Sequence, residues 1–313
     1  MSSGSNTAKT IAGSAVVAVA PGETRRAAVG AVAPWREVAV DGVRLAYNDN
    51  GAGPVIVCLH AIGHGARDFA VLRERLGARY RIITLDWPGH GRSADDRVAV
   101  SAARYTDLLE GFLSALGIER PVLLGNSIGG AAAIRFASAH PTRVRALVLA
   151  NPGGLDRGGN GALTRLITGL SAGFFAAGAR GARWYPRAFA AYYRMILHGP
   201  EAAAQRERIV AAAVEVAPLL AQAWRSFGQP DADIRALAAR ITCPVLFAWA
   251  EHDRINRLGR ARAAIRRFPD ARLETFRGGH AAFLEAPDEF AQSLQRFVDG
   301  LDKAPRESAE PRR

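Results

Sequence analysis

The fold is decided by the stretch Leu123-Leu124-Gly125-Asn126-Ser127-Ile128-Gly129-Gly130, which matches the pattern G-x-S-x-G around Ser127. An apolar run precedes it and an Ala-rich helical stretch follows, so we expect a strand that turns abruptly into a helix at Ser127. The residues two before and two after this serine crowd each other in such a turn, and glycine is therefore required at both places. Because the hydroxyl projects from the sheet edge beside a helix N-terminus, the pattern predicts a nucleophilic serine.

On both sides of this stretch, short β-branched runs alternate with longer helical stretches. We predict strands at 37–40, 44–48, 55–59, 81–85, 122–125, 147–150, 245–249 and 272–276. Asp41-Gly42 lies between the first two and favours a tight hairpin. The later runs are continuously apolar, which is typical of a parallel sheet covered by helices on both faces. The pattern therefore predicts an α/β protein built from βαβ units.

The segment 153–231 interrupts this alternation because it has helical patterning and no convincing strand. It is too long for a simple crossover and too apolar for a disordered loop, so we expect a helical cap over the sheet edge. The α/β core then comprises residues 34–152 and 232–302. Residues 1–33 have little periodicity, and residues 303–313 are charged and contain proline. We expect flexible tails at both places.

The composition of the chain argues against several classes of function. The net charge of +12 is typical of a nucleic-acid binder, but the arginines are spread along the chain without interleaved aromatic residues, so no nucleic-acid partner is expected. No apolar run reaches the roughly 18 residues of a membrane span, and no membrane partner is expected. Two cysteines cannot form a disulfide framework, and no metal or other cofactor is predicted. The N-terminal export signal is weak, which favours a cytoplasmic protein that acts on a small-molecule substrate.

A serine nucleophile needs a base, and the base needs an acid that orients it. His280 follows the last predicted strand, and Asp253 follows the strand at 245–249, so both belong at the edge that carries Ser127. Glu251 is the alternative acid because it lies two residues nearer to the strand. The order Ser127, Asp253, His280 is the one expected for enzymes with this serine turn, and we predict these three as a catalytic triad.

Together these motifs resemble the α/β-hydrolase family over about residues 35–301. The resemblance implies an eight-stranded, mostly parallel sheet with an antiparallel second strand and a helical cap inserted after the sixth strand. It assigns nucleophile, acid and base to Ser127, Asp253 and His280, and the oxyanion hole to the amides of Ile62 and Ile128. Ala61 stands where the family usually has glycine, so the second oxyanion donor is either Ala61 or Ile62.

The predicted function is a serine hydrolase of small, largely apolar esters or related carbonyl compounds. Gly125–Gly130 and Asn151-Pro152-Gly153-Gly154 also look like the meta-cleavage product hydrolases, which cut carbon–carbon bonds in ring-opened dienoates. Those enzymes usually have tryptophan after the base, where this chain has Ala281. For that activity a cap arginine would bind the substrate carboxylate, and the candidates are Arg183, Arg187 and Arg194. A non-catalytic ligand receptor on the same fold is the third alternative. Substrate-binding residues and oligomeric state are not predicted.

Overall fold

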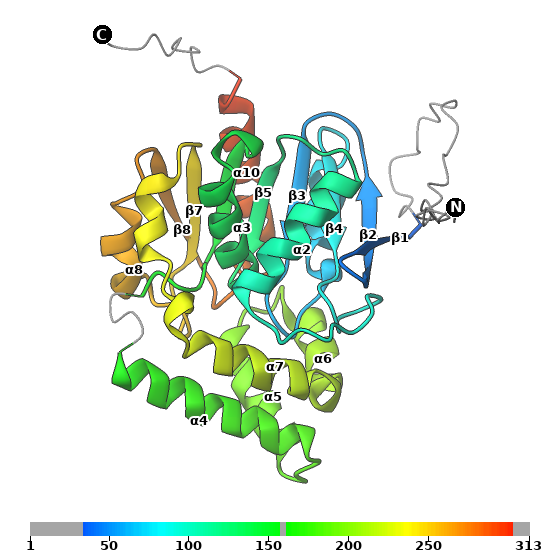
Figure 1. Cartoon of the computed structure of the whole chain (residues 1–313), viewed down its shortest axis with the longest axis vertical. Helices are drawn as coiled ribbons and strands as arrows, with labels where there is room; N and C mark the ends of the chain where they lie inside the picture. Colours follow the sequence, from blue (N-terminus) through cyan, green and yellow to red (C-terminus); the bar gives the residue numbers. More distant parts are fainter. Residues whose placement is uncertain (1–33, 157–160, 303–313) are drawn as a thin grey trace, which may run out of the picture. The chain divides into compact units, whose positions relative to one another are not determined.

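The computed structural model describes residues 34–156 and 161–302, so both predicted tails and the weak export signal lie outside the described residues. A single eight-stranded sheet runs through the described part in the order β1-β2-β4-β3-β5-β6-β7-β8 (Figure 1). The strands are β1 (Arg36–Val40), β2 (Val43–Asn50), β3 (Val55–Leu59), β4 (Arg81–Leu85), β5 (Val122–Asn126), β6 (Ala146–Ala150), β7 (Val245–Ala250) and β8 (Ala271–Phe276). The second strand, β2, is antiparallel to both neighbours and all other pairs beyond it are parallel, which confirms the predicted fold class.

Local sequence explains how the sheet begins and where it is buried. Asp41 and Gly42 adopt φ values of +46° and +75°, as a two-residue hairpin turn between β1 and β2 requires, and Val40 pairs with Val43. Every residue of β5, β6 and β7 is buried. The continuous apolar runs therefore become the central strands of a sheet covered on both faces, as predicted.

Helices cover the two faces of this sheet. The helices α2 (Ala102–Ala115) and α3 (Ile128–Ala139) pack against each other on one face, and α1 (Ala70–Leu76) contacts α10 (Pro287–Gly300) on the other (Figure 1). The Ser101 hydroxyl caps α2 by accepting the Arg104 amide. Two further helices, α8 (Leu258–Ile265) and α9 (Ala282–Glu285), follow β7 and β8.

The chain between β6 and β7 is helical. It forms α4 (Ala162–Ala179), α5 (Tyr185–Ile196), α6 (Ala203–Ala211) and α7 (Ala213–Phe227), and its described residues contain no strand. Figure 1 shows these helices gathered at one end of the sheet, with α4 packed along α7. The boundaries predicted for a cap at 153–231 stay a prediction.

One of these helices departs from the expectation that no segment is long and apolar enough to cross a membrane. Among the described residues, α4 meets that criterion by length and composition. Arg165 and Ser171 interrupt the apolar run of α4, so unbroken apolar runs in the sequence do not reveal it. Core helices of soluble proteins and signal sequences satisfy the same criterion, so α4 is not assigned as a membrane span.

Candidate active site

Ser127 lies at the junction between β5 and α3 in a strained backbone conformation. Its φ is +54° and its ψ is −116°, a combination that residues with a side chain seldom adopt. Backbone hydrogen bonds hold the turn: the Ser127 amide donates to the Ala150 carbonyl at 3.1 Å, and the Ser127 carbonyl accepts from Gly153 and Ala131 at 3.1 and 3.0 Å. These hydrogen bonds to neighbouring segments therefore stabilise the strained backbone conformation of Ser127.

The two glycines that flank Ser127 have the steric role predicted for them. A Cβ on Gly125 would lie 2.6 Å from the Gly129 carbonyl oxygen, and a Cβ on Gly129 would lie 2.3 Å from the Leu59 carbonyl oxygen. Both distances are shorter than any real contact, so neither position accepts a side chain. The second contact also shows that the start of α3 packs directly on the end of β3, which brings the loop after β3 beside Ser127.

The two predicted oxyanion donors lie on either side of this contact. Ile128 is the first residue of α3, where backbone amides have no partner within the helix. In the loop after β3, the Gly63 amide donates to His90 Nε2 at 3.0 Å, and the His64 amide donates to the Ala61 carbonyl at 3.2 Å. The Ile62 amide donates to no described residue. Ile62 and Ile128 therefore have amides available for an oxyanion, and their role stays a prediction.

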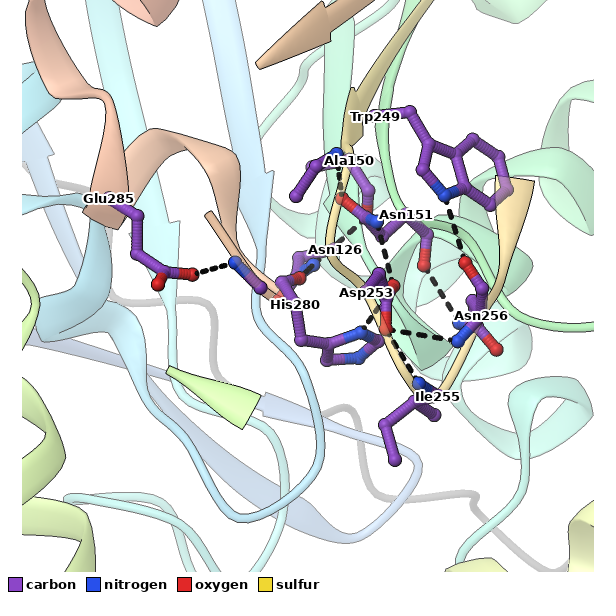
Figure 2. A network of polar contacts seen from close by, with 11 residues as sticks. Asn126, Ala150, Asn151, Trp249, Asp253, Ile255, Asn256, His280 and Glu285 are labelled. Atoms are coloured by element: carbon purple, nitrogen blue, oxygen red, sulfur yellow. Dashed lines mark hydrogen bonds and ion pairs between the residues drawn. The ribbon is translucent and has the colours of Figure 1, made fainter. Parts of the chain in front are cut away.

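Asp253 and His280 come together as the sequence predicted. The His280 Nδ1 atom lies 2.9 Å from Asp253 Oδ2, and both side chains are buried (Figure 2). The same Oδ2 accepts a hydrogen bond from the Asn151 side-chain amide at 2.7 Å, while Oδ1 accepts the backbone amides of Ile255 and Asn256 at 2.7 and 3.1 Å. Donors on every side therefore orient the carboxylate toward the imidazole.

The alternative acid, Glu251, does not contact this pair. Its side chain is exposed and accepts a hydrogen bond from the Thr275 hydroxyl at 3.1 Å. Both candidates follow β7, but the turn after the strand directs the Asp253 carboxylate inward and leaves the Glu251 carboxylate outside. Of the two candidates, Asp253 is therefore the one placed to orient His280.

The backbone of His280 is held beside the serine turn. The Asn126 side-chain amide donates to the carbonyls of His280 and Ala150 at 3.0 and 2.9 Å (Figure 2), which links the His280 loop to the residue before Ser127. Because His280 Nδ1 is directed at Asp253, its Nε2 atom is the ring nitrogen that can accept a proton. No hydrogen bond joins it to the Ser127 hydroxyl among the described residues, and this contact is often long in the absence of substrate. The catalytic triad stays a prediction.

Sequence reasoning missed three residues that position this site, namely Asn126, Asn151 and Glu285. Glu285 has a fully buried side chain whose two oxygens accept the amides of Gly279 at 2.6 Å and Gly199 at 2.7 Å. Gly279 directly precedes His280, and Gly199 follows α5. The available signal was a polar residue in an apolar setting: Asn151 directly after β6, and Glu285 within the apolar segment after His280.

Two buried histidines shape the loop after β3. His60 Nε2 accepts the Trp87 amide at 2.9 Å, and the Trp87 indole donates to the His60 carbonyl at 3.1 Å. Burial lowers the pKa of His60 well below its usual value and lowers the pKa of His90 to about 4. Both rings are therefore neutral at pH 7, and His90 Nε2 remains an acceptor for the Gly63 amide.

A cavity of about 470 Å³, a usual size for a small-molecule site, opens onto Ser127. Its walls come from α3, α4, α5, α7 and the loop after β7. Apolar and aromatic side chains and several hydroxyl groups contribute, among them Ala131, Ile167, Tyr192, Trp224, Phe227, Ile255, Thr164, Thr168 and Ser171. Neither His280 nor Ile62 is among its lining residues. Among the described residues, no three His, Cys, Asp or Glu side chains are grouped to hold a metal ion.

The cavity corrects the prediction of a carboxylate-binding arginine from the cap. Arg183, Arg187 and Arg194 do not line it, and Arg194 instead lines a second cavity of about 620 Å³ beside Asp253. The arginines at the Ser127 cavity are Arg254, Arg257 and Arg260, from the segment after β7. Arg260 pairs with Asp156 at 2.9 Å, whereas Arg254 and Arg257 form no ion pair with any described residue.

Comparison with known proteins identifies the family. The profile described as "Alpha/beta hydrolase family" matches residues 56–293, which is most of the chain. The chain belongs to the alpha/beta hydrolase family. An uncharacterised protein of Mycobacterium tuberculosis is 29% identical over 286 residues, covering 85% of this alpha/beta hydrolase and 81% of that protein.

One further relative and one structurally similar protein have described activities. A 2-hydroxy-6-oxononadienedioate/2-hydroxy-6-oxononatrienedioate hydrolase of Paraburkholderia phymatum is 42% identical over 120 residues, or 36% of this chain and 41% of that enzyme. The structure of a thermophilic esterase from Thermogutta terrifontis superimposes with a TM-score of 0.73 at 22% identity, covering 86% of this chain and 99% of the esterase. This alpha/beta hydrolase is an enzyme, which contradicts the alternative of a non-catalytic receptor.

Proposed function

We propose that this enzyme is a serine hydrolase that cleaves small, largely apolar esters or related carbonyl compounds through an acyl-enzyme. The observation that carries the proposal is the strained Ser127, which opens onto a cavity and whose neighbour Asn126 hydrogen-bonds the loop that carries His280, the partner of Asp253. A serine held at such a backbone angle beside a helix N-terminus has no evident structural role. Nucleophilic attack on a carbonyl group needs that placement.

The contacts assign a role to each group in the proposed reaction. His280 Nε2 takes the proton from Ser127 Oγ as that oxygen attacks the substrate carbonyl carbon. The amides of Ile128 and Ile62 donate to the resulting oxyanion. Asp253 holds the imidazole through Nδ1 and stabilises the imidazolium, which then protonates the leaving alcohol. Water attacks the acyl-enzyme by the same sequence and releases the acid.

The cavity supports the proposed substrate class. Ala131, Trp224, Phe227 and Ile255 provide apolar surface. Burial raises the pKa of the Tyr192 phenol, so this group remains neutral in the cavity at pH 7. An apolar acyl or alcohol group of modest size gains most from such surroundings.

Hydrolysis of p-nitrophenyl butyrate tests the proposed function. The Ser127→Ala variant is expected to lose about 10⁴-fold or more in kcat, leaving what binding and the oxyanion donors supply. The matched control is Ser114→Ala, at an exposed serine on the far end of α2. This control is expected to keep the wild-type kcat. A folded Ser127→Ala variant that hydrolyses the ester at the wild-type rate would contradict the proposal.

The second candidate function is hydrolysis of a carbon–carbon bond in a ring-opened dienoate. Two observations favour it, namely the local similarity to the Paraburkholderia phymatum enzyme and the presence of Arg254 and Arg257 at the cavity, where neither forms an ion pair with a described residue. Guanidinium groups in that position suit a substrate carboxylate. If this is the activity, the enzyme turns over a ring-cleavage dienoate faster than p-nitrophenyl butyrate. Arg254→Gln and Arg257→Gln then raise KM for the dienoate and leave KM for the neutral ester unchanged.

A further inference from the structure

The outer face of α4 exposes large apolar side chains that the fold does not use. Leu163, Leu166 and Leu170 are 63%, 59% and 67% exposed, and their i, i+3, i+7 spacing places them in one row along the helix. The opposite face of α4 is the buried one and carries Thr168, Ala172, Phe175 and Ala176. Figure 1 shows α4 as the helix of this group farthest from the sheet. This row therefore faces away from the rest of the described structure.

The row continues beyond the leucines. Phe174 lies one turn further along the same side of α4, and its ring centroid is 5.8 Å from that of Trp184. Trp184 itself is 52% exposed. We refer to Leu163, Leu166, Leu170, Phe174 and Trp184 as the outer apolar row. It is a continuous apolar surface that ends in a half-exposed indole, the side chain most favoured at a membrane–water interface.

The charged residues of the segment that carries this row have one sign. The segment 161–200 contains five arginines and no aspartate or glutamate. All five are exposed, and none forms an ion pair with a described residue; they are Arg165, Arg180, Arg183, Arg187 and Arg194. Arg180 is the C-cap residue of α4 and Arg183 directly precedes Trp184, so basic side chains lie at the Trp184 end of the row. An apolar row with unpaired basic side chains at its end suits a surface that is apolar inside and negatively charged outside.

We propose that the outer apolar row and its arginines dock the enzyme on the surface of an anionic lipid bilayer, with α4 lying in the plane of the interface. A second copy of the chain is a poorer fit to the same face. A two-fold symmetric contact brings identical patches together, and it would oppose these arginines to themselves. Anionic headgroups instead complement them. This inference departs from the expectation, drawn from the sequence, of no membrane partner.

The docking face is also a wall of the Ser127 cavity. Thr164, Ile167, Thr168 and Ser171 of α4 line that cavity, while the leucines point outward from the same helix. A bilayer against α4 would therefore lie one helix away from the reacting serine. The consequence for substrate, which rests on the proposed function, is that apolar esters partitioned in a membrane are within its reach. Docking itself does not depend on catalysis.

Co-sedimentation with lipid vesicles tests the proposal. The full chain is expected to bind vesicles of equimolar phosphatidylcholine and phosphatidylglycerol, and to bind pure phosphatidylcholine weakly. The triple variant Leu163→Gln, Leu166→Gln, Leu170→Gln is expected to bind the anionic vesicles at least about tenfold more weakly, because three apolar side chains are lost from the contact. The double variant Arg183→Gln, Arg187→Gln is expected to bind the anionic vesicles more weakly than the wild type and to bind pure phosphatidylcholine as the wild type does.

Controls separate docking from folding and from catalysis. Val98→Gln changes an equally exposed apolar residue in a loop outside α4, and it is expected to bind vesicles like the wild type. Ser127→Ala is also expected to bind normally, so loss of activity and loss of docking are distinguishable. Because the three leucines are exposed, their variant is expected to keep the wild-type melting temperature and turnover of a water-soluble ester.

Three results would overturn the proposal. One is a wild-type protein that binds neither kind of vesicle. Another is equal weakening of vesicle binding by Val98→Gln and by the triple leucine variant. The third, from light scattering after size-exclusion chromatography, is a wild-type dimer that the leucine substitutions convert to a monomer without any vesicle binding, since a second copy would then cover the face.

Discussion

Replacing Glu285 with glutamine tests how the histidine loop is held in place. The buried carboxylate accepts two short hydrogen bonds, from the amide of Gly279 next to His280 and from the amide of Gly199 after α5. Glutamine has the same shape but a single acceptor oxygen, so its NH₂ group would face one of the two amides. The substitution therefore removes one charge-assisted hydrogen bond and leaves a buried N–H without a partner.

The size of the effect follows from those two losses. A hydrogen bond to a charged group contributes about 1.5–3 kcal/mol, and an unsatisfied buried donor costs a similar amount. Glu285→Gln is therefore expected to lower the free energy of unfolding by about 3–6 kcal/mol. Displacement of His280 is expected to lower kcat about 10- to 100-fold. KM should change little, because Glu285 does not line the Ser127 cavity.

Urea denaturation and steady-state ester hydrolysis measure both effects on one preparation. The matched control is Glu289→Gln, at an exposed glutamate in the first turn of α10, and it should stay within about 0.5 kcal/mol of the wild type. Hydrolysis is measured at urea concentrations where both proteins are fully folded, so that a fall in kcat reflects the position of His280. If Glu285→Gln matches the wild type in stability and in kcat, Glu285 does not hold the histidine loop in place.

Three further perturbations test other parts of the site. Asn151→Ala removes a donor to Asp253 and is expected to lower kcat about tenfold, and an unchanged kcat would show that the carboxylate needs no such support. Because the pKa of His90 is lowered to about 4, the unfolded state binds more protons than the folded state between pH 4 and 6.5. His90 should therefore contribute a fall in stability of about 2 kcal/mol from about pH 7 to about pH 5, and His90→Gln should lose that much less stability than the wild type, as measured by urea denaturation at each pH. Gly129→Ala places a methyl group against the Leu59 carbonyl and should prevent folding or cost about 3 kcal/mol or more by thermal denaturation, and a stable, active variant would be the contrary result.

Much of the fold was predictable from the sequence because it depends on local sequence patterns. Continuous apolar runs mark strands buried on both faces, and β5 to β7 are buried at every position. Gly125 and Gly129 are needed for contacts within a few residues or with one neighbouring strand. Strand ends also share one edge of a parallel sheet, so Asp253 and His280 were expected to meet there.

The residues that support the site were not predictable from spacing. Asn151 reaches Asp253 across about a hundred positions, and Glu285 joins the loop before His280 to the loop after α5, within the helical segment between β6 and β7. Such hydrogen bonds depend on how helices dock after the sheet has formed. The same is true of the cavity wall, where Arg254 and Arg257 from the segment after β7 replace the expected cap arginines. No sequence rule sets that docking.

The central claim is that Ser127 is an activated nucleophile, and covalent labelling tests it most directly. The folded enzyme is incubated with a fluorophosphonate, and the intact protein and its peptides are weighed by mass spectrometry. An activated Ser127 should gain one adduct per chain, with labelling abolished in Ser127→Ala and strongly slowed in His280→Gln. A folded protein that gains no adduct, or that carries it on another residue at the same rate in Ser127→Ala, would contradict the account.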